Sequence, residues 1–159
     1  MKKDRLALYL PSLQAGGAER VMITLARGFC EHGFEVDLVV AKADGEYLSE
    51  IPDGVKLINL EAQRVLTSLP GLVKYLRKIQ PRVLLSTMDH ANIVSLLAGK
   101  YAGNLTRVVV REASTPSLML KMNSPVKTQV LRYMMRKCYT NADAIVAVSE
   151  GVAIDLRQF

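Results

Sequence analysis

The sequence predicts an α/β fold in which helices cover both faces of a mostly parallel sheet, giving a three-layer αβα domain. Short apolar, β-branched runs alternate with longer segments of helical period, which is typical of repeated strand–helix–strand units. Apolar residues make up 50% of the 159-residue chain, enough to fill one core. We therefore expect one compact domain over residues 1–159.

Six strands and several helices follow from these patterns. The strands are expected at Leu6–Leu10, Glu35–Ala41, Val55–Leu60, Val83–Ser86, Arg107–Arg111 and Ala144–Val148. The first helix carries an apolar stripe from Ala18 to Cys30 and is expected to end at Gly33, with positive φ. Further helices are expected at Leu66–Ile79, Asn92–Tyr101 and Pro125–Tyr139.

The end of the sequence predicts one more helix. Ser149 follows the last strand, which we expect to be buried, and a serine at that position can cap a helix. The sequence stops inside this helix, so we expect the chain to be part of a longer protein.

Composition narrows the class of protein. The two cysteines, Cys30 and Cys138, form no CxxC pair, which favours reduced thiols and a cytoplasmic location over a disulfide framework, a redox motif or a metal site. The start of the chain lacks the cleavage site of a signal peptide, and no apolar run is long enough to span a bilayer. Any membrane contact is therefore expected to be peripheral.

The net charge of +6 is unevenly distributed. No acidic residue occurs in 62–88 or in 113–142, so either segment could face an anion. The second segment contains the basic residues Lys121, Lys127, Arg132, Arg136 and Lys137. Methionines, leucines and a tyrosine are mixed among them, which suits contact with an anionic membrane surface. A core helix with a solvated basic face is the alternative that we favour.

A glycine-containing junction between the first strand and the first helix is the most informative segment. Gly16 and Gly17 open the helix, where backbone N–H groups and the positive end of the helix dipole favour an anion. Both glycines are expected to allow positive φ and close approach of a ligand. A simple strand–helix turn that needs glycine is the competing interpretation.

Two common nucleotide motifs are absent from this junction. The loop reads AGGAER instead of GxGxxG, and the second strand ends without the acidic residue of a dinucleotide site. The pattern GxxxxGK[ST] is also missing, so the sequence disfavours both NAD binding and a P-loop nucleotidase.

The segment LPSLQAGGAERVMITLARGFCEHGFEVDLVV resembles the opening of GT4-type glycosyltransferases, with their GGxER loop, helix and second strand. The segments PRVLLSTMDHANIVSLLAGKYAG and ADAIVAVSEGVAIDL are similar to later parts of the same family, although Arg82 replaces its usual acidic residue. The resemblance covers nearly the whole chain.

This resemblance implies the N-terminal, acceptor-side half of a GT-B fold, a Rossmann-like domain whose donor-binding partner domain is absent from the chain. It implies transfer of a sugar from a UDP- or GDP-sugar to a glycan or lipid-linked acceptor, with retention and without a metal or bound cofactor. Gly16 and Gly17 would then lie near the donor diphosphate. Glu19 and Arg20 complete the match, or serve the helix dipole and surface contacts.

Two further candidate residues follow from this resemblance at the carboxyl edge of the sheet. Glu112 ends the fifth expected strand and could accept a hydrogen bond from the acceptor hydroxyl; pairing with Arg111 or a nearby lysine is the alternative. His90 follows the fourth strand, beside Asp89, for which we favour a helix-capping role.

Two other classes of function remain open. A nucleotide-sugar epimerase can share the two-domain fold, although the GGAER loop favours the transferase. A non-catalytic binding module is suggested by the pI of 9.4, but nucleic acid is disfavoured as a partner because no recognised RNA or DNA motif is present.

Overall fold

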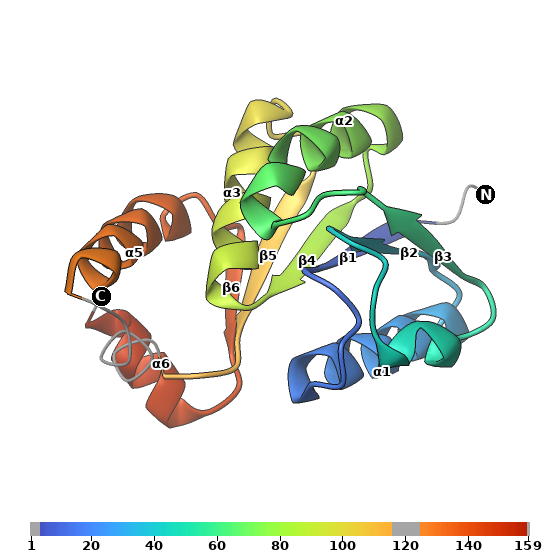
Figure 1. Cartoon of the computed structure of the whole chain (residues 1–159), viewed down its shortest axis with the longest axis horizontal. Coiled ribbons are helices and arrows are strands. Elements are labelled where there is room, and N and C mark those ends of the chain that lie inside the picture. The colour runs from blue at the N-terminus through green and yellow to red at the C-terminus, as the bar shows by residue number, and fades with distance from the viewer. Residues whose placement is uncertain (1–3, 116–124, 159) are drawn as a thin grey trace.

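The computed structural model of the chain describes residues 4–115 and 125–158. Within them, six parallel strands form one sheet in the order β3-β2-β1-β4-β5-β6 (Figure 1). The strands are β1 Arg5–Leu10, β2 Glu35–Val40, β3 Val55–Asn59, β4 Val83–Thr87, β5 Arg107–Glu112 and β6 Ala144–Ala147. The α/β class and all six expected strands are confirmed, with small differences at their ends.

The expected helices are also present. Two 3-10 turns and five α-helices occur in the described part: α1 Gly17–Glu31, η1 Glu46–Glu50, η2 Val65–Ser68, α2 Leu69–Ile79, α3 Asp89–Tyr101, α5 Pro125–Tyr139 and α6 Glu150–Arg157. Gly33 has φ 86° and ends α1 as expected. Ser149 accepts a hydrogen bond from the Val152 amide, which confirms the cap of α6. α3 begins three residues earlier than its apolar period indicated.

Side chains of β1 supply the cores on both faces of the sheet. Leu8 and Leu10 pack with α1 on one face, whereas Ala7 and Tyr9 pack with α2 and α3 on the other. Because successive side chains of a strand point to opposite faces, a strand covered on both sides is apolar along most of its length. Figure 1 shows α1 on one side of the sheet and α2 and α3 on the other.

The last strand differs from its expected burial. β6 pairs with β5 only, and its side chains Ile145 and Val146 remain 43% and 46% exposed. An edge strand of this sheet lacks a second neighbour, and α5 and α6 cover it incompletely in the described part of the chain (Figure 1). The expectation of a buried strand before Ser149 is therefore wrong.

Charged residues of β1 and β2 pair with one another toward the amino ends of these strands. Asp37 of β2 is buried, accepts a hydrogen bond of 2.7 Å from the Tyr75 hydroxyl of α2, and lies 3.5 Å from an Arg5 guanidinium nitrogen. Arg5 also pairs with Glu35. Tyr75 therefore fastens α2 to the sheet through a hydrogen bond to a buried carboxylate.

Replacing Tyr75 by phenylalanine should lower the free energy of unfolding of the chain by about 1–3 kcal/mol, because a buried carboxylate loses its neutral donor. Urea unfolding followed by circular dichroism measures this. Tyr101→Phe is the control, since Tyr101 is 57% exposed and should change the value by less than about 0.5 kcal/mol. Equal effects of the two variants would contradict the proposed fastening.

Candidate functional site at the carboxyl edge of the sheet

Three neighbouring strands bring the candidate residues to one edge of the sheet. β1, β4 and β5 are adjacent and parallel, so the segments that follow them meet at their carboxyl ends. Gly16 and Gly17 lie where the loop after β1 enters α1, Asp89 and His90 begin α3 directly after β4, and Glu112 ends β5. The order of strands reverses between β1 and β4, which is where α/β sheets form ligand crevices.

The glycine loop enters α1 through an extended backbone at Gly16. Gly16 has φ −124° and ψ 157°, and neither Gly16 nor Gly17 adopts the positive φ that glycine allows. Gly16 lies close to the Glu19 carboxylate, which would have to move to make room for an added Cβ. Glu19 is buried in the first turn of α1, where a negative charge interacts favourably with the helix dipole. Arg20 is exposed.

A second loop holds the glycine loop in place. The Leu13 amide donates to the Asp44 carbonyl at 2.8 Å, and the Tyr47 amide donates to the Leu13 carbonyl at 3.0 Å. Gly45, with φ 125°, passes so close to Leu13 that an added Cβ would overlap its carbonyl. The path from β1 to Gly16 is therefore fixed by the segment that follows β2.

The turn after β4 contains unusual backbone. Met88 has φ 78° and ψ 133°, a region that non-glycine residues rarely adopt and that costs about 1–3 kcal/mol. Met88 occupies the N-cap position of α3 and no side chain caps this helix, so the expected capping role of Asp89 is wrong. Asp89 is half-buried in the first turn and His90 beside it is exposed.

Glu112 lies inside a hydrogen-bonded network. Its side chain is fully buried, and Oε1 accepts from the Asn92 amide at 2.8 Å and from the Tyr139 hydroxyl. The Asn92 amide is oriented by Ser86, which donates to its oxygen at 2.8 Å. The alternative of an ion pair with Arg111 is wrong, because that guanidinium donates to Thr87.

Burial dominates the electrostatics of this network. Loss of water raises the pKa of Glu112 to about 7, although the hydrogen bonds from Tyr139 and Asn92 act in the opposite direction. The Asp89 carboxylate raises this pKa further. Burial and the nearby Glu112 charge raise the pKa of Tyr139, so its hydroxyl stays a donor. Glu112 therefore exchanges a proton near neutral pH.

Sequence reasoning missed three members of this network. Ser86, Asn92 and Tyr139 come from β4, α3 and α5, and no sequence spacing places them together. One signal was available: Asn92 is a primary amide inside the apolar run ANIVSLLAG, and a buried amide needs partners.

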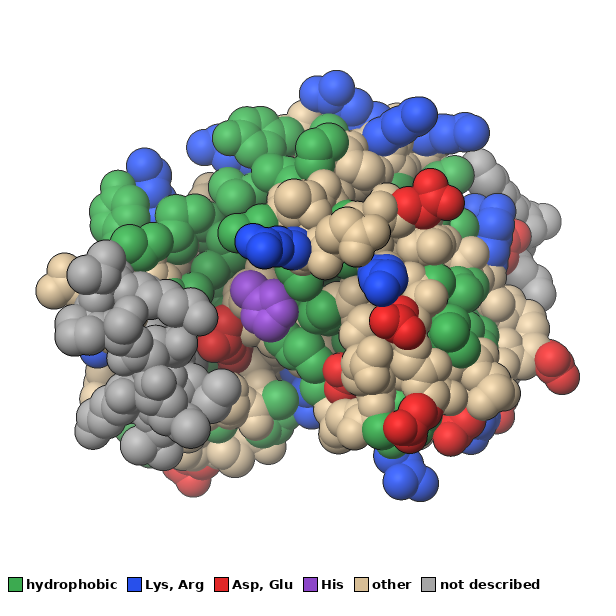
Figure 2. Space-filling view, viewed as in Figure 1, with side chains coloured by type: hydrophobic (Ala, Val, Ile, Leu, Met, Phe, Trp, Pro, Cys, Tyr) green, Lys and Arg blue, Asp and Glu red, His purple; other side chains and the backbone are tan. Residues whose placement is uncertain are grey.

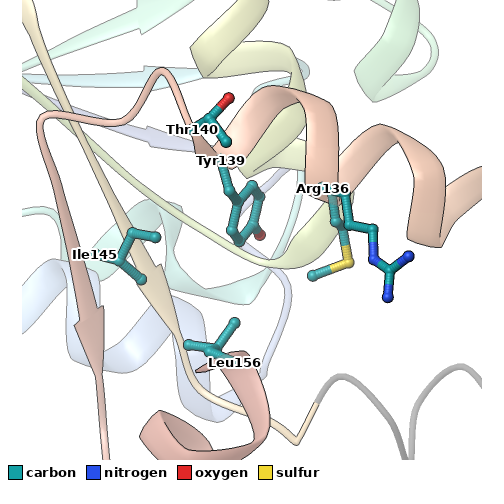
Figure 3. A pocket seen from close by; sticks show the side chains of 6 residues that line it. Arg136, Tyr139, Thr140, Ile145 and Leu156 are labelled. Carbon is teal, nitrogen blue, oxygen red and sulfur yellow. The ribbon is translucent and has the colours of Figure 1, made fainter. Parts of the chain in front are cut away.

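An apolar cavity lies beside the network. It has a volume of about 500 Å³ between α5, β6 and α6, and its lining residues are Met135, Arg136, Tyr139, Thr140, Ile145 and Leu156. In Figure 3 the Tyr139 ring lies among the apolar side chains, whereas the Arg136 guanidinium points away from it. Tyr139 is therefore shared between the cavity wall and the Glu112 network.

The basic segment forms an amphipathic helix. Met135 and Cys138 of α5 are buried against α3 and β5, whereas Arg132, Arg136 and Lys137 are exposed. The apolar face of α5 is therefore part of the core, and its basic face is exposed. Lys121 lies outside the described residues, and the side chain of Lys127 is not described.

A second basic surface covers α2. Lys74, Arg77 and Lys78 are exposed there, and Figure 2 shows Lys and Arg side chains gathered along this edge of the molecule. Among the described residues, no helix is long and apolar enough to cross a membrane. In the same part of the chain, no three His, Cys, Asp or Glu side chains cluster as metal ligands would.

Comparisons with known proteins agree with this geometry. The model of the family described as Glycosyltransferase Family 4 matches residues 15–159. A relative from Campylobacter jejuni is 30% identical over 166 aligned residues, covering 98% of this chain and 44% of the relative. It is named N-acetylgalactosamine-N,N'-diacetylbacillosaminyl-diphospho-undecaprenol 4-alpha-N-acetylgalactosaminyltransferase. The chain thus spans less than half the length of this relative.

Solved structures share the fold. Sucrose-phosphate synthase from Thermosynechococcus elongatus superimposes with a TM-score of 0.68 at 16% identity, over 99% of this chain and 45% of that one. HepE from Anabaena, solved with UDP and glucose, gives 0.67 at 16% identity, over 98% of this chain and 41% of that one. At these identities the similarity shows the fold alone.

The pKa of Glu112 predicts a pH dependence of stability. Between its ordinary value of 4.5 and about 7, the folded state binds more protons than the unfolded state, so the free energy of unfolding falls as pH rises. In Glu112→Gln this fall should be smaller than in the wild type, by up to about 3 kcal/mol over the interval.

Urea unfolding at a series of pH values measures the difference. Glu50→Gln, which changes an exposed carboxylate, is the control and should follow the wild-type curve. Parallel curves for the wild type and Glu112→Gln would show that Glu112 is ionised throughout.

Proposed function

Because this chain belongs to Glycosyltransferase Family 4, we propose that it is the acceptor-side domain of an enzyme that transfers a sugar, with retention, from a UDP- or GDP-sugar. The acceptor is a glycan or lipid-linked sugar of cell-surface polysaccharide or glycolipid synthesis. The observation that carries this proposal is the meeting of the glycine loop and the acidic network at one sheet edge, within the matched residues 15–159.

The glycine loop serves the donor phosphates in this proposal. The first amides of an α-helix have no acceptor within the helix, and the α1 dipole adds positive potential at Gly17. A diphosphate leaving group gains negative charge as the sugar departs, so fixed donors at this place stabilise the transition state more than the ground state. The donor itself binds mainly to a second domain, and no cofactor is required.

In this proposal, residues at the adjacent carboxyl ends of β4 and β5 receive the proton of the acceptor hydroxyl. Glu112 and His90 are the candidates from the sequence: Glu112 has a pKa raised to about 7 but is fully buried, whereas His90 is exposed beside Asp89. A buried group that titrates near neutral pH can hold or release a proton while a neighbouring group meets the hydroxyl.

The exposed face of α5 is the part we propose to lie on the membrane. Val130 and Tyr133 are 58% and 60% exposed between the basic residues Arg132, Arg136 and Lys137. Exposed apolar groups beside lysine and arginine suit the headgroup region of an anionic bilayer. A lipid-linked acceptor, as named for the Campylobacter jejuni relative, would be held at that surface.

The full-length protein that contains this domain should transfer sugar from a UDP- or GDP-sugar, whereas the chain alone should not, because it lacks the donor subsite. An assay of a donor panel, with product analysis by mass spectrometry, tests both. Conversion of the donor without transfer would favour the epimerase, and silence with all donors and acceptors would favour a binding module.

Removing the α5 charges should weaken binding to vesicles. The triple variant Arg132→Ala, Arg136→Ala, Lys137→Ala should bind vesicles rich in anionic lipid about 100-fold more weakly, at about 1 kcal/mol per charge. Co-sedimentation of the chain at low and high salt measures this.

The α2 triple variant Lys74→Ala, Arg77→Ala, Lys78→Ala removes the same charge from another surface and is the matched control. Equal loss in the two triple variants would indicate non-specific attraction of a basic protein. No lipid-dependent binding by the wild-type chain would rule out the membrane contact.

A further inference from the structure

One carboxylate oxygen at the candidate site has no hydrogen-bond donor. Glu112 Oε1 accepts from Asn92 and Tyr139, but Oε2 is buried and has no hydrogen-bond partner. A buried polar atom without a partner costs about 1–3 kcal/mol, so such an atom needs an explanation.

Asp89 is the acidic group that acts on the Glu112 carboxyl. The strands pair Thr87 with Arg111, so the residues that follow each of them are neighbours at the end of β4 and β5. Asn92, three residues after Asp89 and on the same face of α3, already bonds to Glu112. The strained Met88 directs the chain into α3 immediately before Asp89. The negative charge of Asp89 accordingly raises the pKa of Glu112.

Two ionised carboxylates cannot form a hydrogen bond with each other, because each can only accept one. We propose that Asp89 and Glu112 hold one proton between them, on Glu112 Oε2, and that Asp89 is the member that accepts a hydrogen bond from the acceptor hydroxyl. This inference rests on the proposed transferase function for its catalytic part, but the shared proton is a property of the chain itself.

The groups around Glu112 favour one proton shared between Glu112 and Asp89. α3 contributes Asp89 and Asn92, and α5 contributes the Tyr139 hydroxyl, which remains a donor. The neighbouring β6 residue in register is Ala147, and the Arg111 guanidinium is directed to Thr87. No cation among these contacts neutralises a second negative charge, so the site favours holding one proton.

Exposure assigns the two roles. Glu112 is fully buried and cannot meet a substrate directly, whereas Asp89 is half-buried at the edge of the sheet. A proton on Glu112 Oε2 lets it donate to Asp89, so that Asp89 is held in place to face the ligand. Glu112 is then a positioning residue and Asp89 the catalytic one.

Carbon-13 NMR titration of Asp and Glu carboxyl groups in the chain tests the shared proton. In the wild type, Glu112 should titrate near pH 7. Asp89→Asn should lower the Glu112 pKa by about one unit or more, because the neighbouring charge is lost, and Tyr139→Phe should raise it, because a donor is lost. Asp53→Asn and Tyr133→Phe, which change exposed side chains, should leave it unchanged.

If Asp89→Asn shifts the Glu112 pKa by less than about 0.3 unit, the shared proton is ruled out. This holds whether or not the full-length protein transfers sugar. Opposite shifts from the α3 and α5 variants would support it, because general unfolding of the site would move both pKa values in one direction.

Kinetics of the full-length protein test the catalytic part, once the wild type shows transfer. Asp89→Asn should lower kcat by about 10²- to 10⁴-fold, and Asp53→Asn should not. Glu112→Gln, whose amide donates permanently, should keep at least about a tenth of kcat and lose the pH dependence of the rate near 7. Wild-type kcat in Asp89→Asn, or an unchanged pH profile in Glu112→Gln, would overturn the assignment.

Discussion

The burial of β1 on both faces is the constraint on which the rest of the structure depends. A parallel strand that is covered on both faces needs apolar side chains on both of them, and β1 meets this with Leu8 facing one core and Tyr9 the other. The sheet extends from β1 through β2 on one side and through β4 on the other. The chain must therefore cross both faces, and the ends of β1, β4 and β5 meet at one edge.

Most of the fold could be predicted because its signals are local. The apolar runs placed the strands, and Gly33 and Ser149 marked a helix end and a helix start through their own backbone and side-chain chemistry. The failures are non-local. The burial of β6 depends on what packs against it, and the start of α3 depends on the unusual backbone of Met88, which its side chain does not indicate.

The candidate site was predictable only in part. Strand ends gave the positions of Glu112 and His90, because parallel strands collect their carboxyl ends at one edge. The partners of Glu112 come from a neighbouring strand and two helices, so their contacts arise from packing. The burial of Glu112 also depends on packing, and it distinguishes Glu112 from the half-buried Asp89. The proposed division of roles between Asp89 and Glu112 therefore required the three-dimensional arrangement.

The contact between Gly45 and Leu13 limits how this domain can be altered. The segments after β1 and β2 continue the hydrogen bonding of their strands past the sheet, so neither has an independent backbone path. Lengthening, shortening or grafting the segment before α1 alone would break bonds to the other segment. Variation in this part of the family should therefore occur as paired changes in two loops, and a chimera that exchanges both together should keep the placement of Gly16.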